Sequence, residues 1–469
     1  MVDVSQFYSV KSWKKSVSLL QWMSCGLLFC AGAALLAAHI FTDSMLTFIS
    51  VALYVCWGEL FVAGIRWGGW EDNWPSIVAA GWLLTCTLGV WDFTGQIFFP
   101  GPSYAATVWF LWLLLVGYLA LRAGMFGGFR ARALSMTIEN ACKSLSPEFL
   151  APRSFRYSLV ALGLCSCVGL CFIYAYFGSI PLLSDNPPLA RYQFFNGPFT
   201  KNMFRFFFRV CAAISMVASM YLVVLINRDS SLKEKMATVI TVVFSLLCAL
   251  ASGSRGDFSV LMLFIGIRAI FLWPAKKRLV PALVACSVCV TAFCVLTLSR
   301  IKDGLGSLAS VFPELADGAM LTHAAKAYDV PLAWGKTYLS ALLSFVPSSV
   351  FPFRETYGFG RYSLEILYLG DDSPIAPTYG GLRPTFVGEA YLNGGIIGVI
   401  LFGLVLGICL GAWRARQETI QHFSGGWVVF FLLSLLAVMV SDFYGIFHGL
   451  LLVVGLVWAV EKMLKRSAC

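Results

Sequence analysis

Apolar runs of about 20 residues recur along the chain, and most of the charged residues lie between them. A transmembrane helix needs about 20 apolar residues in a row, so this pattern predicts an all-α, polytopic membrane protein. An outer-membrane barrel would instead alternate apolar and polar residues over short segments. The runs predict about twelve spans in one membrane domain covering residues 1–469. The spans are 17–39, 45–65, 76–95, 103–121, 157–178, 206–226, 236–252, 258–273, 280–298, 394–412, 426–443 and 446–460.

The basic residues between these spans predict an orientation. Lysines precede the first span, and basic clusters follow the fourth, sixth, eighth, tenth and twelfth spans, the largest of them between residues 122 and 156. Basic loops of membrane proteins face the cytoplasm, so both termini and these clusters are expected there. The first apolar run lacks a small-residue cleavage site and is interpreted as a span, not as a cleavable signal peptide. The orientation indicates a multi-pass protein of a cytoplasmic membrane.

Composition supports this class. Only 12% of the residues are charged, against about a quarter in a soluble domain, and the net charge is +10. The cytoplasmic loops account for the positive charge, so no nucleic-acid partner is expected. Most of the 15 cysteines lie inside apolar runs and none lies in a predicted outer segment, so disulfides are not expected. Cys286 and Cys289 form a single C-x-x-C pair without further metal ligands.

Two long segments are expected on the outer face, residues 179–205 and 299–393. The second is too long for a simple connection, and such loops are commonly functional. Its stretch "YLSALLSFVPSSVFPF" is apolar but too short to span, which predicts short helices that enter or lie on the membrane. Pro347 and Pro352 would interrupt such a helix.

Arginines recur in the outer segments, where positive charge is usually depleted. The planar guanidinium binds phosphate in a bidentate way, so a lipid-linked pyrophosphate is a candidate ligand. The alternative is that each arginine extends to lipid phosphates or pairs with a nearby acid. Gly253 and Gly256 flank Arg255 and permit a tight turn there, while Asp257 is its alternative partner. The candidate arginines are Arg191, Arg205, Arg209, Arg255, Arg300, Arg354, Arg361 and Arg383.

Glu389 is the candidate general base. It lies between aromatic and glycine residues just before the span 394–412, where partial burial would raise the pKa of its carboxyl group. The alternative is a carboxylate that interacts with a helix N-terminus. Asp371 and Asp372 are interpreted as a turn without the ligands of a metal site, and His323 as a surface or packing residue.

Four segments together resemble the Wzy-type oligosaccharide repeat-unit polymerases, which make O-antigen and capsule polysaccharides. They are "SGSRGDF", "ARYQFFNGPF", "SFVPSSVFPFR" and "RPTFVGEAYLNGGIIGV". The spacing from Arg383 to Gly394 fits the arginine-x10-glycine pattern of that family's large periplasmic loop. The earlier loop departs from it, because Asn202 stands eleven residues after Arg191. The resemblance covers pieces of the chain between Arg191 and Gly398, and elsewhere only the topology.

This resemblance implies a GT-C-like fold and glycosyl transfer at the periplasmic face of a bacterial inner membrane, without metal or cofactor. The donor would be a glycan on undecaprenyl pyrophosphate, and the acceptor a hydroxyl of one lipid-linked repeat unit. A chain-length regulator and a flippase are implied partners. Glu389 and Arg255 would be catalytic, and the other candidate arginines would bind substrate. The aromatics expected either to stack on sugars or to anchor at the interface are Tyr192, Phe194, Tyr357, Tyr362 and Tyr379.

Three other functions stay open at the sequence level. An O-antigen ligase would use the same donor but pass the glycan to the lipid A core. A transporter or flippase without chemistry would show internal repeats and charged or broken helices near the bilayer midplane. A structural membrane protein is the third. The outer-face charge lies at the ends of the spans, which favours chemistry at the membrane surface.

Overall fold

The computed structural model describes residues 104–145, 153–184, 199–226, 230–252, 258, 261–262, 264–265, 314–343, 350–367 and 385–415. Within this part the chain forms helices and turns and no strands, as the sequence predicts. The helices are α4 (Tyr104–Arg130), α5 (Arg132–Leu145), α6 (Arg153–Phe177), η4 (Pro181–Leu183), α8 (Phe199–Leu225), α9 (Leu232–Ala251), α12 (Glu314–Ala327), α13 (Lys336–Leu342), α14 (Phe353–Thr356), α15 (Phe359–Leu367) and α16 (Thr385–Arg414).

Four helices are long and apolar enough to cross a membrane, which confirms that the chain is a membrane protein. They are Ala105–Arg130, Arg156–Phe177, Leu232–Ala251 and Thr385–Trp413, and α8 contains a shorter apolar stretch, Val210–Leu225. They coincide with the predicted spans 103–121, 157–178, 236–252, 394–412 and 206–226. The other predicted spans lie outside the described residues, apart from a few positions of 258–273.

The ends of two helices differ from the prediction. α4 continues past residue 121 to Arg130, because one charged residue does not interrupt the helical hydrogen bonds. α16 begins at Thr385, so the segment before residue 394 is helical and not part of a loop. Neighbouring helices bury that segment. The hydropathy of a single segment does not show which other helices pack against it, so the prediction missed this part of the helix.

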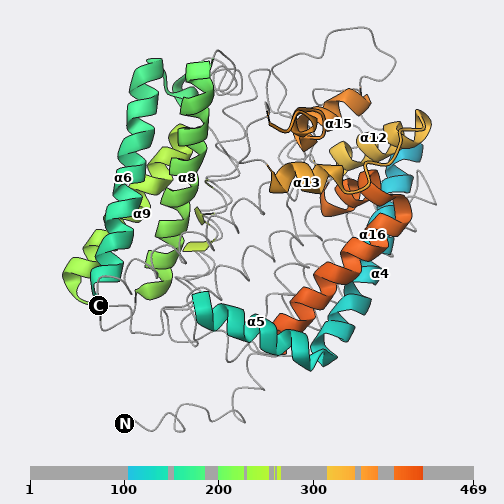
Figure 1. The fold of residues 1–469 in the computed structure, drawn as a ribbon, viewed down its shortest axis with the longest axis horizontal. Helices are drawn as coiled ribbons and strands as arrows, with labels where there is room; N and C mark the ends of the chain where they lie inside the picture. The colour runs from blue at the N-terminus through green and yellow to red at the C-terminus, as the bar shows by residue number, and fades with distance from the viewer. Residues whose placement is uncertain are drawn as a thin grey trace, which may run out of the picture.

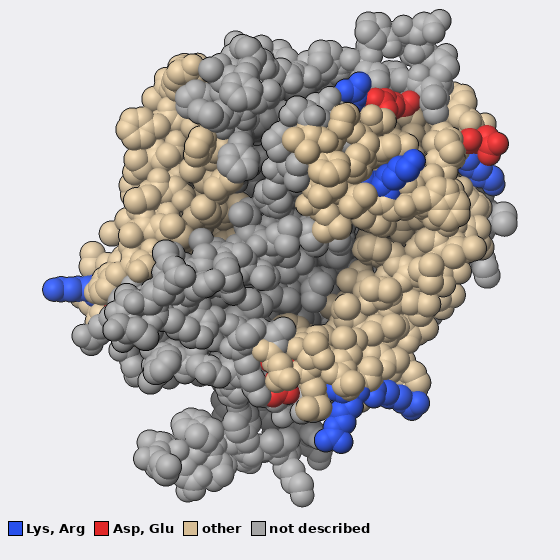
Figure 2. All heavy atoms as spheres, in the orientation of Figure 1, with Lys and Arg blue, Asp and Glu red and all other residues tan. Residues whose placement is uncertain are grey.

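The described helices form two groups (Figure 1). α6, α8 and α9 pack together on the left of the view, and α4 and α16 pack along each other on the right, with α12, α13 and α15 at their upper end. α5 contacts both α4 and α16 at the opposite end. The face in Figure 2 carries its described charged side chains near helix ends, and none along the middle of α4 and α16.

Glycines bring α4 and α16 into backbone contact. A Cβ atom on Gly124 would lie 2.3 Å from the Leu404 carbonyl oxygen, and one on Gly407 would lie 2.1 Å from that of Leu121. Small residues spaced four apart allow such close approach in membranes, where packing replaces the hydrophobic effect as the main attraction between helices. The partners on α16 advance along the chain as those on α4 do, so the two helices run parallel.

Buried hydroxyl groups connect the three helices of the other group. Ser219 Oγ donates to Ser245 Oγ (2.8 Å), which donates to the carbonyl oxygen of Ser215 (3.2 Å). Tyr174 donates its phenol proton to the Cys248 carbonyl oxygen at 3.2 Å. Each bond satisfies a polar group that the bilayer could not solvate, so these polar residues are compatible with apolar helices.

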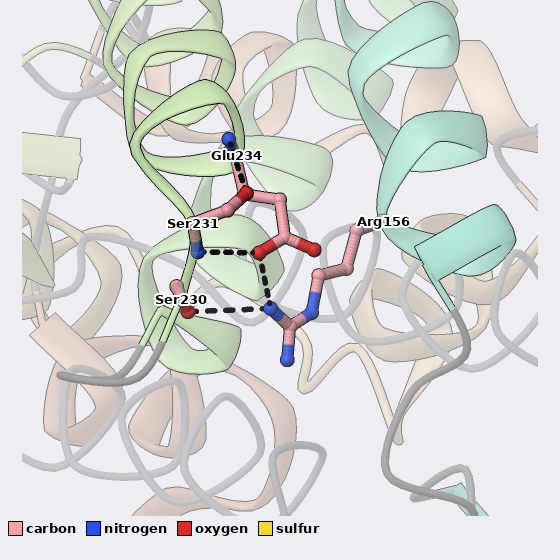
Figure 3. A network of polar contacts seen from close by, with 4 residues as sticks. All are labelled: Arg156, Ser230, Ser231 and Glu234. Carbon is pink, nitrogen blue, oxygen red and sulfur yellow. Dashed lines mark hydrogen bonds and ion pairs between the residues drawn. The ribbon is translucent and has the colours of Figure 1, made fainter.

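An ion pair joins the start of α6 to the start of α9 (Figure 3). Arg156 Nη1 lies 3.4 Å from Glu234 Oε2 and donates to Ser230 Oγ at 3.2 Å. Glu234 also accepts the backbone N–H of Ser231 at 2.8 Å, and Ser231 Oγ accepts the Glu234 N–H, which forms a capping box. The contact holds the starts of α6 and α9 together on one side of the group.

Candidate functional site

α16 is broken at two consecutive glycines. Gly394 (φ −148°, ψ 18°) and Gly395 (φ 61°, ψ −151°) both leave the helical conformation, and that of Gly395 is open essentially to glycine alone. The chain then folds back closely: a Cβ on Gly398 would lie 2.3 Å from the Ala390 carbonyl oxygen. The break therefore depends on glycine for its backbone conformation and for its packing.

The loop before α13 binds the carbonyl groups that the break releases. Ala333 N–H donates to the Leu392 carbonyl oxygen and Trp334 N–H to that of Asn393, both at 2.9 Å. Gly335, with φ 79° at the N-cap of α13, donates its N–H to Asn393 Oδ1 at 3.0 Å. Three successive amides thus pair with the end of the first helical segment, as buried backbone groups require.

Glu389 lies one helical turn before Asn393 and is 1% exposed. Thr337 Oγ1 donates to Glu389 Oε1 at 3.0 Å. Asn393 Nδ2 donates to Thr337 Oγ1 at 2.6 Å and to the Glu389 backbone carbonyl oxygen at 2.9 Å. A hydroxyl group has one proton, so the bond that Thr337 accepts from Asn393 orients that proton toward the carboxylate.

Tyr338 follows Thr337 and stacks on Phe402 of α16, with ring centroids 5.6 Å apart. Its hydroxyl oxygen is shielded from solvent. Burial raises the pKa of Tyr338, and the negative charge of Glu389 raises that pKa further. The phenol therefore keeps its proton at physiological pH, in the same region as the carboxylate.

An apolar cluster fixes α12 and α15 against α16 beside this site. Its buried members are Leu321, Ala324, Ala325, Ala333, Tyr362, Ile366 and Leu392. Because Tyr362 is buried in this cluster, its ring packs inside the protein and is not open to a sugar. Tyr357 is half-buried beside it, with the two ring centroids 5.5 Å apart.

Backbone strain concentrates around the same helices. In the described part of the chain, the residues other than glycine with positive φ are Asp329 (50°), Trp334 (49°) and Thr385 (62°). Asp329 and Trp334 lie in the loop between α12 and α13, and Thr385 begins α16. Positive φ is uncommon for residues other than glycine and is an outlier for β-branched or bulky ones, and such strain clusters at functional sites.

The structure places four of the eight predicted arginines. Arg361 is exposed and pairs with Glu365, the distance from Nε to Oε1 being 2.8 Å. Arg354 lies in α14, and Arg205 and Arg209 lie in α8, which belongs to the group on the other side of Figure 1 from α16. The predicted site residues outside the described residues are Arg191, Arg255, Arg300 and Arg383, and the aromatics Tyr192, Phe194 and Tyr379 lie there too. His323 lies half-buried in α12.

Four residues at the break in α16 are absent from the sequence-based site: Trp334, Thr337, Tyr338 and Asn393. A signal for Asn393 exists, because an amide followed by two glycines is unusual inside an apolar run. The other three lie more than 50 residues before Glu389, and no local pattern connects them to it.

Comparison with known proteins assigns no family: no family model, curated protein or solved structure matches the chain. Within the described residues, no group of three or more His, Cys, Asp and Glu side chains could hold a metal ion. The chemistry that the described site offers is that of a carboxylate held by a hydroxyl group at a helix break.

Proposed function

We propose that the protein polymerises lipid-linked oligosaccharide repeat units at the periplasmic face of a bacterial inner membrane, as Wzy-type polymerases do. The observation that carries the proposal is the Glu389 carboxylate, which is buried at the break in α16 and accepts a hydrogen bond from Thr337. The residues around it, Arg383 to Gly398, also carry the strongest part of the sequence resemblance.

In this proposal Glu389 takes the proton from a hydroxyl of the acceptor repeat unit. The oxygen then forms a bond to the anomeric carbon of the donor glycan, and the bond from that carbon to undecaprenyl pyrophosphate breaks. The pyrophosphate leaves with the electron pair, so no nucleotide is required. Arginines stabilise the charge on the leaving group, and Arg255 is the first candidate. General bases of this kind contribute about 10²–10⁴-fold to a rate.

Thr337 and Asn393 act on Glu389 as positioning residues. Their hydrogen bonds fix the carboxylate on the side of α16 that faces α13. Tyr338 adds a protonated hydroxyl group nearby. The 20 residues from Gly395 to Arg414 rise about 30 Å as a helix, enough to cross the hydrocarbon core without the segment that carries Glu389. In this proposal Glu389 therefore acts at the membrane surface, outside the span.

A transporter of lipid-linked glycans is the second candidate, and the broken α16 is the observation that favours it. Discontinuous helices whose ends face a substrate are a common device of transporters. A buried carboxylate at such a break is compatible with substrate binding as well as with proton transfer.

The test is a deletion strain that expresses Glu389→Gln, with the surface glycan separated on a gel and the lipid-linked glycan extracted. Glutamine keeps the size of the side chain and accepts the Thr337 bond but cannot take a proton. We expect the long ladder to disappear while lipid A capped with one repeat unit persists. Glu365→Gln is the matched control, because Glu365 lies in α15, with 35% of its side chain exposed and paired with Arg361, and it should leave the ladder normal.

Each rival predicts a different outcome of the same test. Loss of a transporter would remove the single-repeat caps together with the ladder. Loss of an O-antigen ligase would remove both from lipid A while long polymer accumulates on the carrier lipid. Normal ladders in the deletion strain itself would refute all three functions. Thr337→Val should weaken the ladder and Thr337→Ser should restore it, because serine keeps the hydroxyl group.

A further inference from the structure

We propose that Trp334 is a carbohydrate-stacking residue of the Glu389 site, against which the acceptor repeat unit packs one sugar ring. The proposal rests on the polymerase function and extends it to a residue that the sequence resemblance does not include. It concerns where the acceptor is held, and leaves the proton transfer to Glu389 unchanged.

The conformation of Trp334 is the first argument. The side chain is 78% exposed, and its backbone has φ 49°, a region in which glycine is favoured and bulky residues are outliers. The exposed ring makes too few contacts within the protein to compensate for this strain. Strained conformations persist at positions where the surrounding structure enforces them, and they cluster at ligand sites.

The attachment of Trp334 to the site is the second argument. Its N–H donates to the Asn393 carbonyl oxygen at 2.9 Å, and both neighbouring amides also bond to the broken end of α16. Thr337, which binds the Glu389 carboxylate, follows three residues later. Three residues span at most about 10 Å, so the Cα atom of Trp334 lies within that distance of the Cα atom of Thr337, the residue that holds the base.

The chemistry of the surroundings favours a sugar. The faces of an aromatic ring are electron-rich and pair with the weakly positive C–H face of a sugar ring, as they pair with the edges of other rings. Lys336 lies two residues away, is exposed, and donates to the Tyr357 hydroxyl oxygen at 3.2 Å. Its ammonium group lies over the Tyr357 ring, 4.8 Å from the ring centroid, and supplies a positive charge at the start of α13, to which sugar hydroxyl groups or a phosphate can bind.

An interfacial anchor in the membrane is the alternative role of an exposed tryptophan. Anchoring requires only that the ring reach the headgroup region, and a residue at ordinary φ achieves this without strain. The fixed and strained backbone of Trp334 therefore favours a ligand of defined position over a lipid surface.

The test compares Trp334→Gly and Trp334→Tyr in the deletion strain and in purified protein. Glycine accepts φ 49° without strain, so Trp334→Gly removes the ring while the fold is retained, and its melting temperature should not fall. The probe is the lipid-linked repeat unit extracted from the deletion strain. We expect the glycine variant to shorten the ladder and to raise KM for the repeat unit roughly tenfold or more, with kcat little changed. Tyrosine keeps an aromatic ring and should retain most of the activity.

Phe172→Ala is the matched control, because Phe172 is 72% exposed and lies in α6, in the other group of helices. It should leave ladder and KM as in the wild type. A wild-type ladder and KM for Trp334→Gly would overturn the stacking proposal, and the polymerase function would stand if Glu389→Gln still abolished the ladder. A glycine variant with normal KM but a lower amount in the membrane would identify an interfacial anchor instead. Normal ladders for Glu389→Gln would refute the assigned base, independently of Trp334.

Discussion

Two adjacent glycines of α4 provide a sharp test of the contact between α4 and α16. A Cβ atom on Gly128 would lie 2.1 Å from the Ile408 carbonyl oxygen and 2.7 Å from the Ile408 Cα atom. A Cβ atom on Gly127 would have nothing within 4 Å. Both residues lie inside the same helix, so Gly128→Ala and Gly127→Ala differ only in what the new methyl group meets.

The magnitude follows from two opposing terms. Alanine is favoured over glycine in a helix interior by about 1 kcal/mol, and this gain is common to both variants. At Gly128 the backbone of α16 must move by about 1 Å to reach normal contact, and overpacking of this kind costs about 1–3 kcal/mol or more. The difference between the variants therefore measures the steric term alone. We expect Gly128→Ala to be less stable than Gly127→Ala by about 1–3 kcal/mol, a factor of roughly 5 to 150 in the folding equilibrium.

The assay is thermal unfolding of the purified protein in one detergent, with gel filtration after each temperature to measure the folded fraction. Gly127→Ala should melt at or slightly above the wild-type temperature, and Gly128→Ala clearly below it. Gly407→Ala, whose methyl group would meet the Leu121 carbonyl oxygen at 2.1 Å, should behave like Gly128→Ala. Equal stability of Gly128→Ala and Gly127→Ala would refute the close parallel packing of α4 and α16.

Two further predictions concern a buried ion pair and a buried phenol. Arg156→Met leaves the buried Glu234 carboxylate without its cation and should destabilise the protein by about 2 kcal/mol. Adding Glu234→Gln should recover most of this loss of stability. A double-mutant cycle of melting temperatures measures the coupling, and additive losses would contradict the ion pair. Burial raises the pKa of Tyr362 from 10.0 to about 12, so the phenol loses its proton at lower pH in the unfolded chain than in the folded one. The stabilisation by the neutral phenol is therefore complete below pH 10 and is lost as the pH rises to 12. From pH 8 to pH 11, the free energy of unfolding should therefore fall by about 1.4 kcal/mol less in Tyr362→Phe than in the wild type. Thermal unfolding at the two pH values measures this, and an equal fall in both proteins would show that Tyr362 is exposed.

The sequence predicted the all-helical membrane class and, within the described residues, the apolar helices, because both depend on local hydropathy. It also selected Glu389, since a carboxylate beside a long apolar run is conspicuous. It misplaced the start of α16, because Thr385 to Asn393 are buried by contacts with α4, α12 and the loop before α13, which the hydropathy of one segment does not report. Thr337 and Trp334 could not be found this way, since their contacts with α16 cross more than 50 residues of chain.

The parallel pairing of α4 and α16 also constrains how the protein can be made. Gly124 and Gly407 meet in space but are separated by about 280 residues of chain. At a synthesis rate of about 5–20 residues per second, α4 waits roughly 15 to 55 s in the membrane before its partner leaves the ribosome. During that interval its row of glycines is open to other small-residue helices, whether of this chain or of another. The Glu389 site needs both the start of α13 and the first part of α16, so a chain that ends before Asn393 contains no such site.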